Sequence, residues 1–348
     1  MAALLLSGMV LQAGAPTILP PYAEPNAPLV NSGPPSGTGF APSQGGFMLT
    51  LGGTPGPSHG IFTNAATLGL LYLPDADIVG RSDVGTEIAF RRSFRTDLAS
   101  AKIHSPGMPD GWTHNLDVIM SPATDKAQWR GLRLRWPNGA VEDVLPLIDA
   151  KGQPTGEFQH GPGQPFLITG EVGAGLNEWK SITMLWRTGG IWRFEPHASG
   201  PMVLREIGER TSPTLSLRMG YDPERHLAEV TRPPEKVPVM RFGYQDGRLA
   251  SVTEAIGGSY RTFTYAPLKD GKETVLWKVS GLTGRDKTPV DRFAYSYTKS
   301  AGVPFLSSIA IPSPAGGAEW ATAKIEYKEG RVAAMVDANG NRTELTQE

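Results

Sequence analysis

A phrase that the chain carries twice constrains its fold more than any other feature. Segment 244–255 reads YQDGRLASVTEA, and it returns over 327–338 as YKEGRVAAMVDA. A looser copy, with one extra residue in its turn, occupies 221–231. Internal repeats stack on their neighbours and share one core, so the sequence predicts a repeat architecture.

Each copy predicts a β-hairpin. Apolar residues alternate with polar or small ones over 215–221, 240–244 and 323–327, which is the period of a half-buried strand. A glycine then follows an acidic residue at 246–247 and at 329–330, and glycine takes the positive φ of a tight turn at little cost. A second apolar segment follows each turn.

The second strand of the hairpin carries an irregularity. Leu249 and Val252 are three positions apart and would face opposite sides of a regular strand. A β-bulge near Ala250-Ser251 would place both on the same face. We therefore expect successive antiparallel hairpins over 205–348. The tyrosines expected at equivalent positions are Tyr221, Tyr244, Tyr265 and Tyr327, with a degenerate unit near 293–297.

The repeated phrase resembles the YD repeat of RHS proteins, which occur in bacterial RHS and Tc-type toxin shells and in animal teneurins. Upstream, FRRSFR at 90–95 and GWTHNLD at 111–117 resemble the domain that often precedes the repeats in bacterial members, with Phe94 where the family often has Tyr. The resemblance covers residues from about 60 to 348.

The resemblance implies structural roles for two sets of residues. The repeat-motif set is Tyr221, Asp222, Tyr244, Asp246, Gly247, Arg248, Tyr327, Gly330 and Arg331. The pre-repeat set is Arg92, Ser93, Gly111, Trp112, His114 and Asn115. We expect Trp112 to be a buried anchor packed against Phe90 or Phe94, and His114 to satisfy buried backbone groups at a strand end.

The sequence divides into four segments. Residues 1–15 resemble a signal peptide clipped at its start, because a short apolar run precedes a small-x-small cleavage site. A Pro/Gly-rich linker occupies 16–60, with one island at 47–51 that could dock as a short strand. A β-rich pre-repeat domain (61–204) and the YD repeats (205–348) complete the chain.

Composition supports an all-β fold of antiparallel hairpin repeats, either an open curved sheet or a partial shell. Gly 42 and Pro 31 indicate many turns, and no stretch sustains the helical apolar period over three turns. Within 61–204, alternation predicts hairpins over 132–145 and 181–194. The net charge of −1 argues against nucleic acid as the main partner, and the apolar amino-terminal run is too short to span a bilayer.

The chemistry-bearing residues form no recognisable catalytic, cofactor or metal site, so the expectation is that the chain is not an enzyme. The six histidines include no pair at metal-ligand spacing. Segment 337–341 lacks the bidentate Glu of an EF-hand and reads as a hairpin turn. A glycosidase is an outside alternative, resting on the carboxylate pairs Glu206 with Glu209 and Glu142 with Asp143.

Two functions remain open. The first is a secreted or cell-surface bacterial wall of β-hairpins, which in the family encloses a toxin or forms a surface body. Its partners would be further RHS repeats or another shell component. The second is a module that binds cell-wall glycans through exposed aromatics at Tyr260, Tyr295 and Tyr297.

Toxin activity is not implied. The Asp-Pro-x-Gly segment of the family's self-cleaving core is not visible, because Asp222-Pro223 lies inside a repeat and continues differently. We also expect an incomplete wall, whose final strands over 323–348 leave an open edge that favours self-association.

Overall fold

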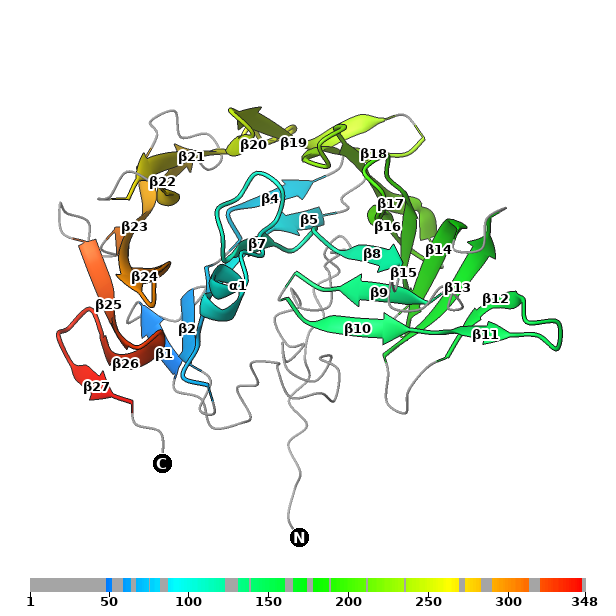
Figure 1. Ribbon diagram of the computed structural model, residues 1–348. Coiled ribbons are helices and arrows are strands. Elements are labelled where there is room, and N and C mark those ends of the chain that lie inside the picture. The colour runs from blue at the N-terminus through cyan, green and yellow to red at the C-terminus, as the bar shows by residue number, and fades with distance from the viewer. Residues whose placement is uncertain are drawn as a thin grey trace, which may run out of the picture.

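The protein is built almost entirely from antiparallel β-strands, as the sequence predicts (Figure 1). A computed structural model describes residues 48–51, 59–63, 67–74, 76–81, 87–122, 131–137, 139–159, 165–173, 178–187, 189–210, 212–234, 236–268, 273–282, 290–312 and 320–345. The predicted signal peptide (1–15) lies outside these ranges, as does most of the predicted linker (16–60).

The first part of the chain forms a small five-stranded sheet, here called the inner sheet. Its order is β1-β2-β3-β6-β7, and a separate hairpin β4–β5 leaves it between β3 and β6. Strand β1 coincides with the apolar island of the predicted linker and pairs with β2. The bounds are β1 (Met48–Leu51), β2 (His59–Thr63), β3 (Leu70–Leu73), β4 (Ile78–Arg81), β5 (Glu87–Phe90), β6 (Arg92–Arg95), α1 (Thr96–Ser100) and β7 (Trp112–His114).

The middle of the chain closes into a ring of strands. Strand β16 pairs with β15 along one edge and with both β8 and β17 along the other. From β8 the pairing runs through β9 to β10, and β11, one residue further on, pairs with β12 and so leads back through β13 and β14. The bounds are β8 (Ile119–Pro122), β9 (Leu132–Arg135), β10 (Val141–Val144), β11 (Pro146–Ile148), β12 (Pro154–Phe158), β13 (Phe166–Val172), β14 (Trp179–Trp186), β15 (Gly190–Pro196) and β16 (Met202–Glu209).

Aromatic side chains fill the interior of this closed set of strands, β8 to β16. Trp136, just after β9, lies 5.8 Å from Phe166, 6.0 Å from Trp186 and 6.3 Å from Trp192, measured between ring centroids. Buried aromatic rings in tilted contact supply most of the apolar area that a small closed sheet buries. The predicted hairpins over 132–145 and 181–194 correspond to β9–β10 and β14–β15.

From β16 onward the chain forms one continuous curved sheet, here called the arc. Each strand pairs antiparallel with the next from β17 to β27, and among the described strands β27 pairs only with β26. The bounds are β17 (Ser212–Tyr221), β18 (Leu227–Arg232), β19 (Val237–Gln245), β20 (Arg248–Glu254), β21 (Tyr260–Pro267), β22 (Thr274–Leu282), β23 (Val290–Ser300), β24 (Val303–Pro312), β25 (Trp320–Lys328), β26 (Arg331–Val336) and β27 (Arg342–Glu344).

A single extra residue recurs in the second strand of successive hairpins. In β19–β20, Tyr244 pairs with Leu249 and Gly243 pairs with Ser251, so Ala250 is left unpaired where the sequence predicts a bulge. Leu249 and Val252 are both buried as a result. The pairs next to the bulge are Val172–Trp179, Phe194–Leu204, Tyr221–Leu227, Tyr244–Leu249, Tyr265–Leu276, Tyr297–Leu306 and Tyr327–Val332.

This recurring bulge accounts for the curvature of the arc. A bulge bends its strand and increases the local twist, and a bulge at the same place in each hairpin adds these bends in one direction. The same geometry is present upstream of residue 205, in β13–β14 and β15–β16. Those hairpins carry Val172 and Phe194 where the later ones carry Tyr, so the motif is not visible in their sequence.

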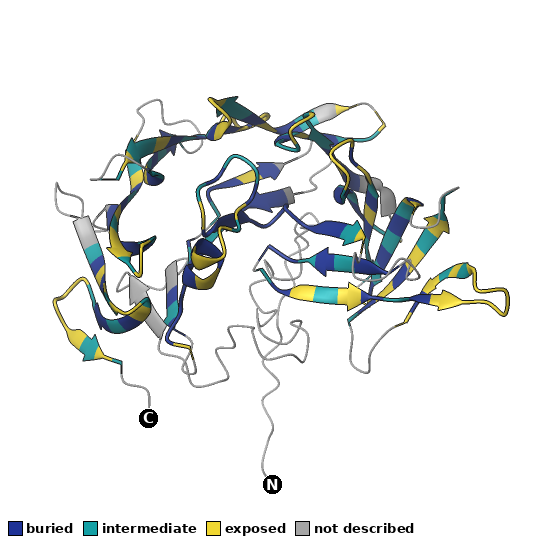
Figure 2. Cartoon of the chain, in the orientation of Figure 1, coloured by how far each residue is buried: buried dark blue, intermediate teal, exposed yellow. Residues whose placement is uncertain are grey.

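The inner sheet lies in the concave side of the arc (Figure 1), and the two share one core. Buried residues of both belong to one cluster, and buried and exposed residues alternate along the strands of the arc, with exposed residues also at turns (Figure 2). Phe90 of β5 lies 5.2 Å from Phe242, and Tyr72 of β3 lies 6.0 Å from Tyr295. Backbone bonds also cross, since Leu249 N donates to Gly107 O at 2.9 Å.

Candidate functional site

The repeat tyrosines form a ladder of hydrogen bonds across the arc. Each hydroxyl donates to the carbonyl oxygen of a leucine in the preceding hairpin, at 2.8–3.0 Å. The pairs are Tyr221 to Leu204, Tyr244 to Leu227, Tyr265 to Leu249 and Tyr327 to Leu306. The accepting leucine is the residue that pairs with the aromatic residue of its own hairpin, so each bond joins equivalent points of neighbouring units.

Burial fixes these tyrosines in their neutral form. Desolvation raises the pKa of the Tyr221, Tyr244, Tyr265 and Tyr327 hydroxyls above the ordinary value. A neutral hydroxyl donates one hydrogen bond, and the bulge leaves a leucine carbonyl within its reach. These repeat tyrosines therefore join each hairpin to the preceding one by a side-chain hydrogen bond.

The acidic and glycine positions of the motif make the turns. Asp246 and Gly247 both take positive φ, 51° and 70°, and Glu329 and Gly330 repeat this with 53° and 81°. Two successive residues with positive φ give the tight turn whose twist matches the strands that flank it. Arg248 lies over the ring of Tyr265 at 6.0 Å, and Arg331 begins β26 as an exposed residue.

The β23–β24 hairpin lies between the units of Tyr265 and Tyr327, and its tyrosine makes a different hydrogen bond. Tyr297 occupies the bulge position of β23–β24, as the degenerate unit near 293–297 predicts. Its hydroxyl accepts a hydrogen bond from Nε1 of Trp112 at 3.0 Å. Trp112 belongs to β7, so this unit is joined directly to the inner sheet.

Arg92 of β6 forms a buried ion pair with Asp77, just before β4, and also bonds Tyr295 of the arc. Its Nη2 donates to Asp77 Oδ1 at 2.7 Å and to the Tyr295 hydroxyl at 3.3 Å, and its Nε also bonds Asp77. The guanidinium lies 5.0 Å from the ring of Trp112 and 5.4 Å from that of Phe263. Burial alone would lower the pKa of Arg92, but the Asp77 carboxylate raises it, so the guanidinium stays charged.

Gly111 and Trp112 pack the pre-repeat motif against β6. Trp112 is completely buried, and its ring centroid lies 5.5 Å from that of Phe94, which confirms the expected aromatic anchor. Gly111 has φ of 84°, and a Cβ there would come within 2.7 Å of Phe94 and of Ala99. Only glycine fits at that point.

Ser93 and Asn115 satisfy polar groups inside this part of the fold. The Ser93 hydroxyl lies 2.8 Å from that of Thr113 on the paired strand. Asn115 Oδ1 accepts from Arg91 N at 2.8 Å, and its Nδ2 donates to Ala89 O at 2.7 Å. Asn115 therefore ties the end of β5 to the chain after β7.

His114 lies in a buried polar cluster that includes Arg135 of strand β9. Its Nδ1 accepts from Leu116 N at 3.3 Å, in line with the expected structural role. Nearby, Asp117 Oδ2 accepts from Ser105 Oγ at 2.8 Å and from Arg135 Nη2 at 2.9 Å. Burial lowers the pKa of His114 to about 4. The Ser105 hydroxyl bonds the carboxylate, so Ser105, His114 and Asp117 do not have the connectivity of a hydrolase triad.

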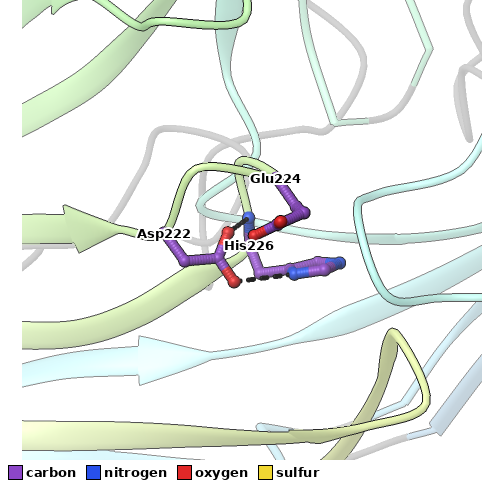
Figure 3. Close-up of side chains that lie close together, drawn as sticks. All are labelled: Asp222, Glu224 and His226. Carbon is purple, nitrogen blue, oxygen red and sulfur yellow. Dashed lines mark hydrogen bonds and ion pairs between the residues drawn. The ribbon is translucent and has the colours of Figure 1, made fainter.

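The turn between β17 and β18 gathers Asp222, Glu224 and His226 (Figure 3). One potential ligand atom from each lies within 4.8 Å of the other two. Asp222 Oδ2 lies 2.8 Å from His226 Nδ1, and Asp222 Oδ1 accepts from His226 N at 2.8 Å. The sequence indicates no metal-ligand spacing here because the extra residue in this turn, and not a motif, brings the three side chains together.

Two of the carboxylates considered from the sequence form ion pairs with arginines. Asp143 pairs with Arg133 at 2.9 Å, and Glu206 lies 3.8 Å from Arg193, so each of these carboxylates has an arginine partner. Tyr295, one of the aromatics expected to be exposed for glycans, is instead 2% exposed in the core. That expectation is wrong for Tyr295 because β23 turns this side chain toward Tyr72 and Trp112.

The turn after β26 and the length of the helices bear on two remaining expectations. Asp337 Oδ1 accepts from Asn339 N at 2.9 Å and from Asn341 N at 2.8 Å, which is the hairpin turn that the sequence predicts. No helix in the described part of the chain is long and apolar enough to cross a lipid bilayer.

No family model and no curated protein matches the chain. Among solved structures, the chain is similar to a crystal structure of TcdB2-TccC3-Cdc42, with a TM-score of 0.23 and 11% identity over 83% of this chain. It is also similar to a structure of the Photorhabdus luminescens Tc holotoxin pore, with a TM-score of 0.22 and 12% identity over 85% of this chain. This chain spans 19% and 18% of the length of those chains.

Proposed function

We propose that the chain is a non-catalytic wall segment of the RHS or YD-repeat type, which acts outside the bacterial cytoplasm and bounds an enclosed cargo. The observation that carries the proposal is the tyrosine ladder with its recurring bulge. Four tyrosines bond the preceding unit at equivalent positions, and repeated contacts between neighbours are how solenoid-like walls extend. The resemblance of segments 90–95 and 111–117 to the domain before such repeats supports the same assignment.

The location is tested in the bacterium that carries the gene. The chain is produced with an epitope tag, and intact cells are treated with a protease before the tag is detected. A tag that is digested on intact cells, while a cytoplasmic control protein survives, is the expected result. A tag found only in the cytoplasmic fraction contradicts export.

The wall role is tested by purifying the tagged chain under native conditions. We expect a second polypeptide to purify with it and to resist protease until the arc is denatured. A Tyr244→Phe variant, which removes one bond of the ladder, should lower the denaturant concentration at which that protection is lost. Purification of the chain with no protected partner contradicts an enclosing role.

A second candidate is carbohydrate binding, which Trp277 favours. Trp277 is the bulge residue of β22 and is 48% exposed, whereas the equivalent positions in the other arc hairpins carry Ala or Ser. An exposed indole face packs well on the apolar face of a sugar ring. A glycan array tests this with Trp277→Ala and Trp277→Phe as a pair. Binding should be lost with Ala and kept with Phe.

A further inference from the structure

The cluster Asp222, Glu224 and His226 is a preorganised turn. Asp222 N donates to His226 O at 3.0 Å, and Arg225 N donates to Asp222 O at 3.0 Å. Arg225 takes positive φ, 71°, which lets the chain reverse after Glu224. The backbone alone therefore holds the three side chains on one side of the turn.

The β15–β16 turn and strand β19 contact the cluster from its two sides. The Asp222 carbonyl lies 2.9 Å from His197 Nε2 of the β15–β16 turn. On the other side, the His226 ring stacks on the Tyr244 ring with centroids 4.4 Å apart. A ligand set whose backbone and imidazole are already fixed loses little entropy when an ion binds.

The Glu224 carboxylate lies close to that of Asp222 but accepts no hydrogen bond within the described part of the chain. Figure 3 shows the Glu224 carboxylate turned toward Asp222 and His226. Asp222 bonds the main-chain and side-chain nitrogens of His226, whereas no donor among the described residues bonds Glu224. A cation between the carboxylates would relieve their mutual repulsion.

We propose that Asp222, Glu224 and His226 bind one divalent transition-metal ion of the zinc class. One imidazole nitrogen with two carboxylate oxygens suits Zn²⁺ and its neighbours, whereas Ca²⁺ and Mg²⁺ prefer oxygen alone. The ion would take the place of the hydrogen between Asp222 Oδ2 and His226 Nδ1, and the ring would then carry its proton on Nε2. Tetrahedral ligand atoms bound at about 2.0–2.2 Å are separated by roughly 3.3–3.6 Å, so Asp222 Oδ2 and His226 Nδ1, now 2.8 Å apart, would separate by a side-chain adjustment as the ion enters.

A bound ion would make the β17–β18 turn, at the start of the arc, more rigid. All three ligands belong to the β17–β18 turn, so an ion there would stiffen this turn, which already contacts His197 before it and Tyr244 after it. The inference rests on this cluster alone and holds whether or not the chain encloses a cargo.

The experiment uses the full chain without a histidine tag, stripped of metal by a chelator and titrated with Zn²⁺ in a calorimeter. We expect one equivalent to bind. Glu224→Gln should weaken binding by roughly tenfold or more, equivalent to about 1.4 kcal/mol. Because Glu224 is exposed, this variant should keep the fold, which its circular dichroism spectrum checks. His226→Gln should abolish binding.

The matched control is His104→Gln. His104 Nδ1 lies 2.7 Å from Asp110 in an exposed His–Asp pair outside the three-residue cluster, so its loss should leave zinc binding unchanged. Three results overturn the proposal: a stripped chain that binds no zinc, a Glu224→Gln chain that binds as tightly as the original, and a site that takes Ca²⁺ in preference to Zn²⁺. Cobalt(II) absorption bands that shift on binding give a second readout of nitrogen ligation.

Discussion

At the scale of single residues, the pre-repeat motif is a set of packing and polar anchors. The burial of Trp112 is expected from the resemblance of segment 111–117 to a pre-repeat domain. The sequence does not predict the Asp77–Arg92 ion pair or the bond from Trp112 to Tyr297. Trp112 and Tyr297 are 185 positions apart, and Asp77 and Arg92 lie on separate segments 15 positions apart, so no periodicity within one strand encodes either contact.

Replacing Trp112 by Ala should lower the free energy of unfolding by about 3–5 kcal/mol, because a completely buried indole is lost and a cavity is left. Trp112→Phe keeps most of the apolar volume but loses the bond to Tyr297, so it should cost less. Urea denaturation of the three proteins measures the difference. An unchanged midpoint for Trp112→Ala would show that the segment is not an anchor.

Protonation of His114 should destabilise the fold in acid. Its pKa is about 4 in the folded chain, below the ordinary value of 6.5, so the unfolded chain binds the proton first as the pH falls. Stability from this group is complete above about pH 6.5 and declines between 6.5 and 4, by about 3 kcal/mol in all. Asp117, whose pKa Arg135 lowers against the effect of burial, adds a further loss at lower pH.

Unfolding at pH 7 and at pH 4.5 tests this dependence. His114→Asn keeps an acceptor for Leu116 N and removes the titration, so its stability should fall less over that interval. An equal fall in both proteins would assign the acid sensitivity to other groups.

At the scale of elements, the hairpins were predictable where the motif is complete and hidden where it is not. Turn glycines and alternation indicate β19–β20 and β25–β26 directly. Strands β15–β16 share their geometry but place Phe194 at the tyrosine position, and a longer turn separates it from Leu204. The helix α1 was also not predicted, because five residues are too few to show the helical period.

Deleting Ala250 should straighten one hairpin without changing which side chains face the core. Tyr244 would still pair with Leu249, and Gly243 with Ser251, but no residue would be left over. The lost bend should draw Phe242 away from Phe90, so amide exchange in β5 and β19 should accelerate. Deleting the exposed Gly258 from the next loop is the control and should leave exchange in β5 unchanged.

At the scale of the whole molecule, the inner sheet and the arc form one folding unit. The sequence suggested a pre-repeat domain followed by repeats, and nothing local signals that the first packs inside the curve of the second. The contacts that do this pair β5 with β19 and β21, and β3 with β23, across long stretches of chain.

Fragment 205–348 should therefore not fold stably alone. It would expose the side chains that cover the inner sheet, namely Phe242, Phe263, Phe293 and Tyr295. We expect strong binding of a hydrophobic dye and no cooperative thermal transition, in contrast to the full chain. A fragment that melts cooperatively at the same temperature as the full chain would contradict a shared core.

The ladder of tyrosine bonds has a consequence for how such a gene can change. Units joined by equivalent bonds can be gained or lost by duplication and deletion where nothing else holds them. Three units are exempt, because Phe242 of β19 and Phe263 of β21 pack on Phe90, and Tyr297 of β23 bonds Trp112. The number of hairpins from β19 to β24 should therefore stay fixed among descendants of this gene, and changes in copy number should fall outside that span.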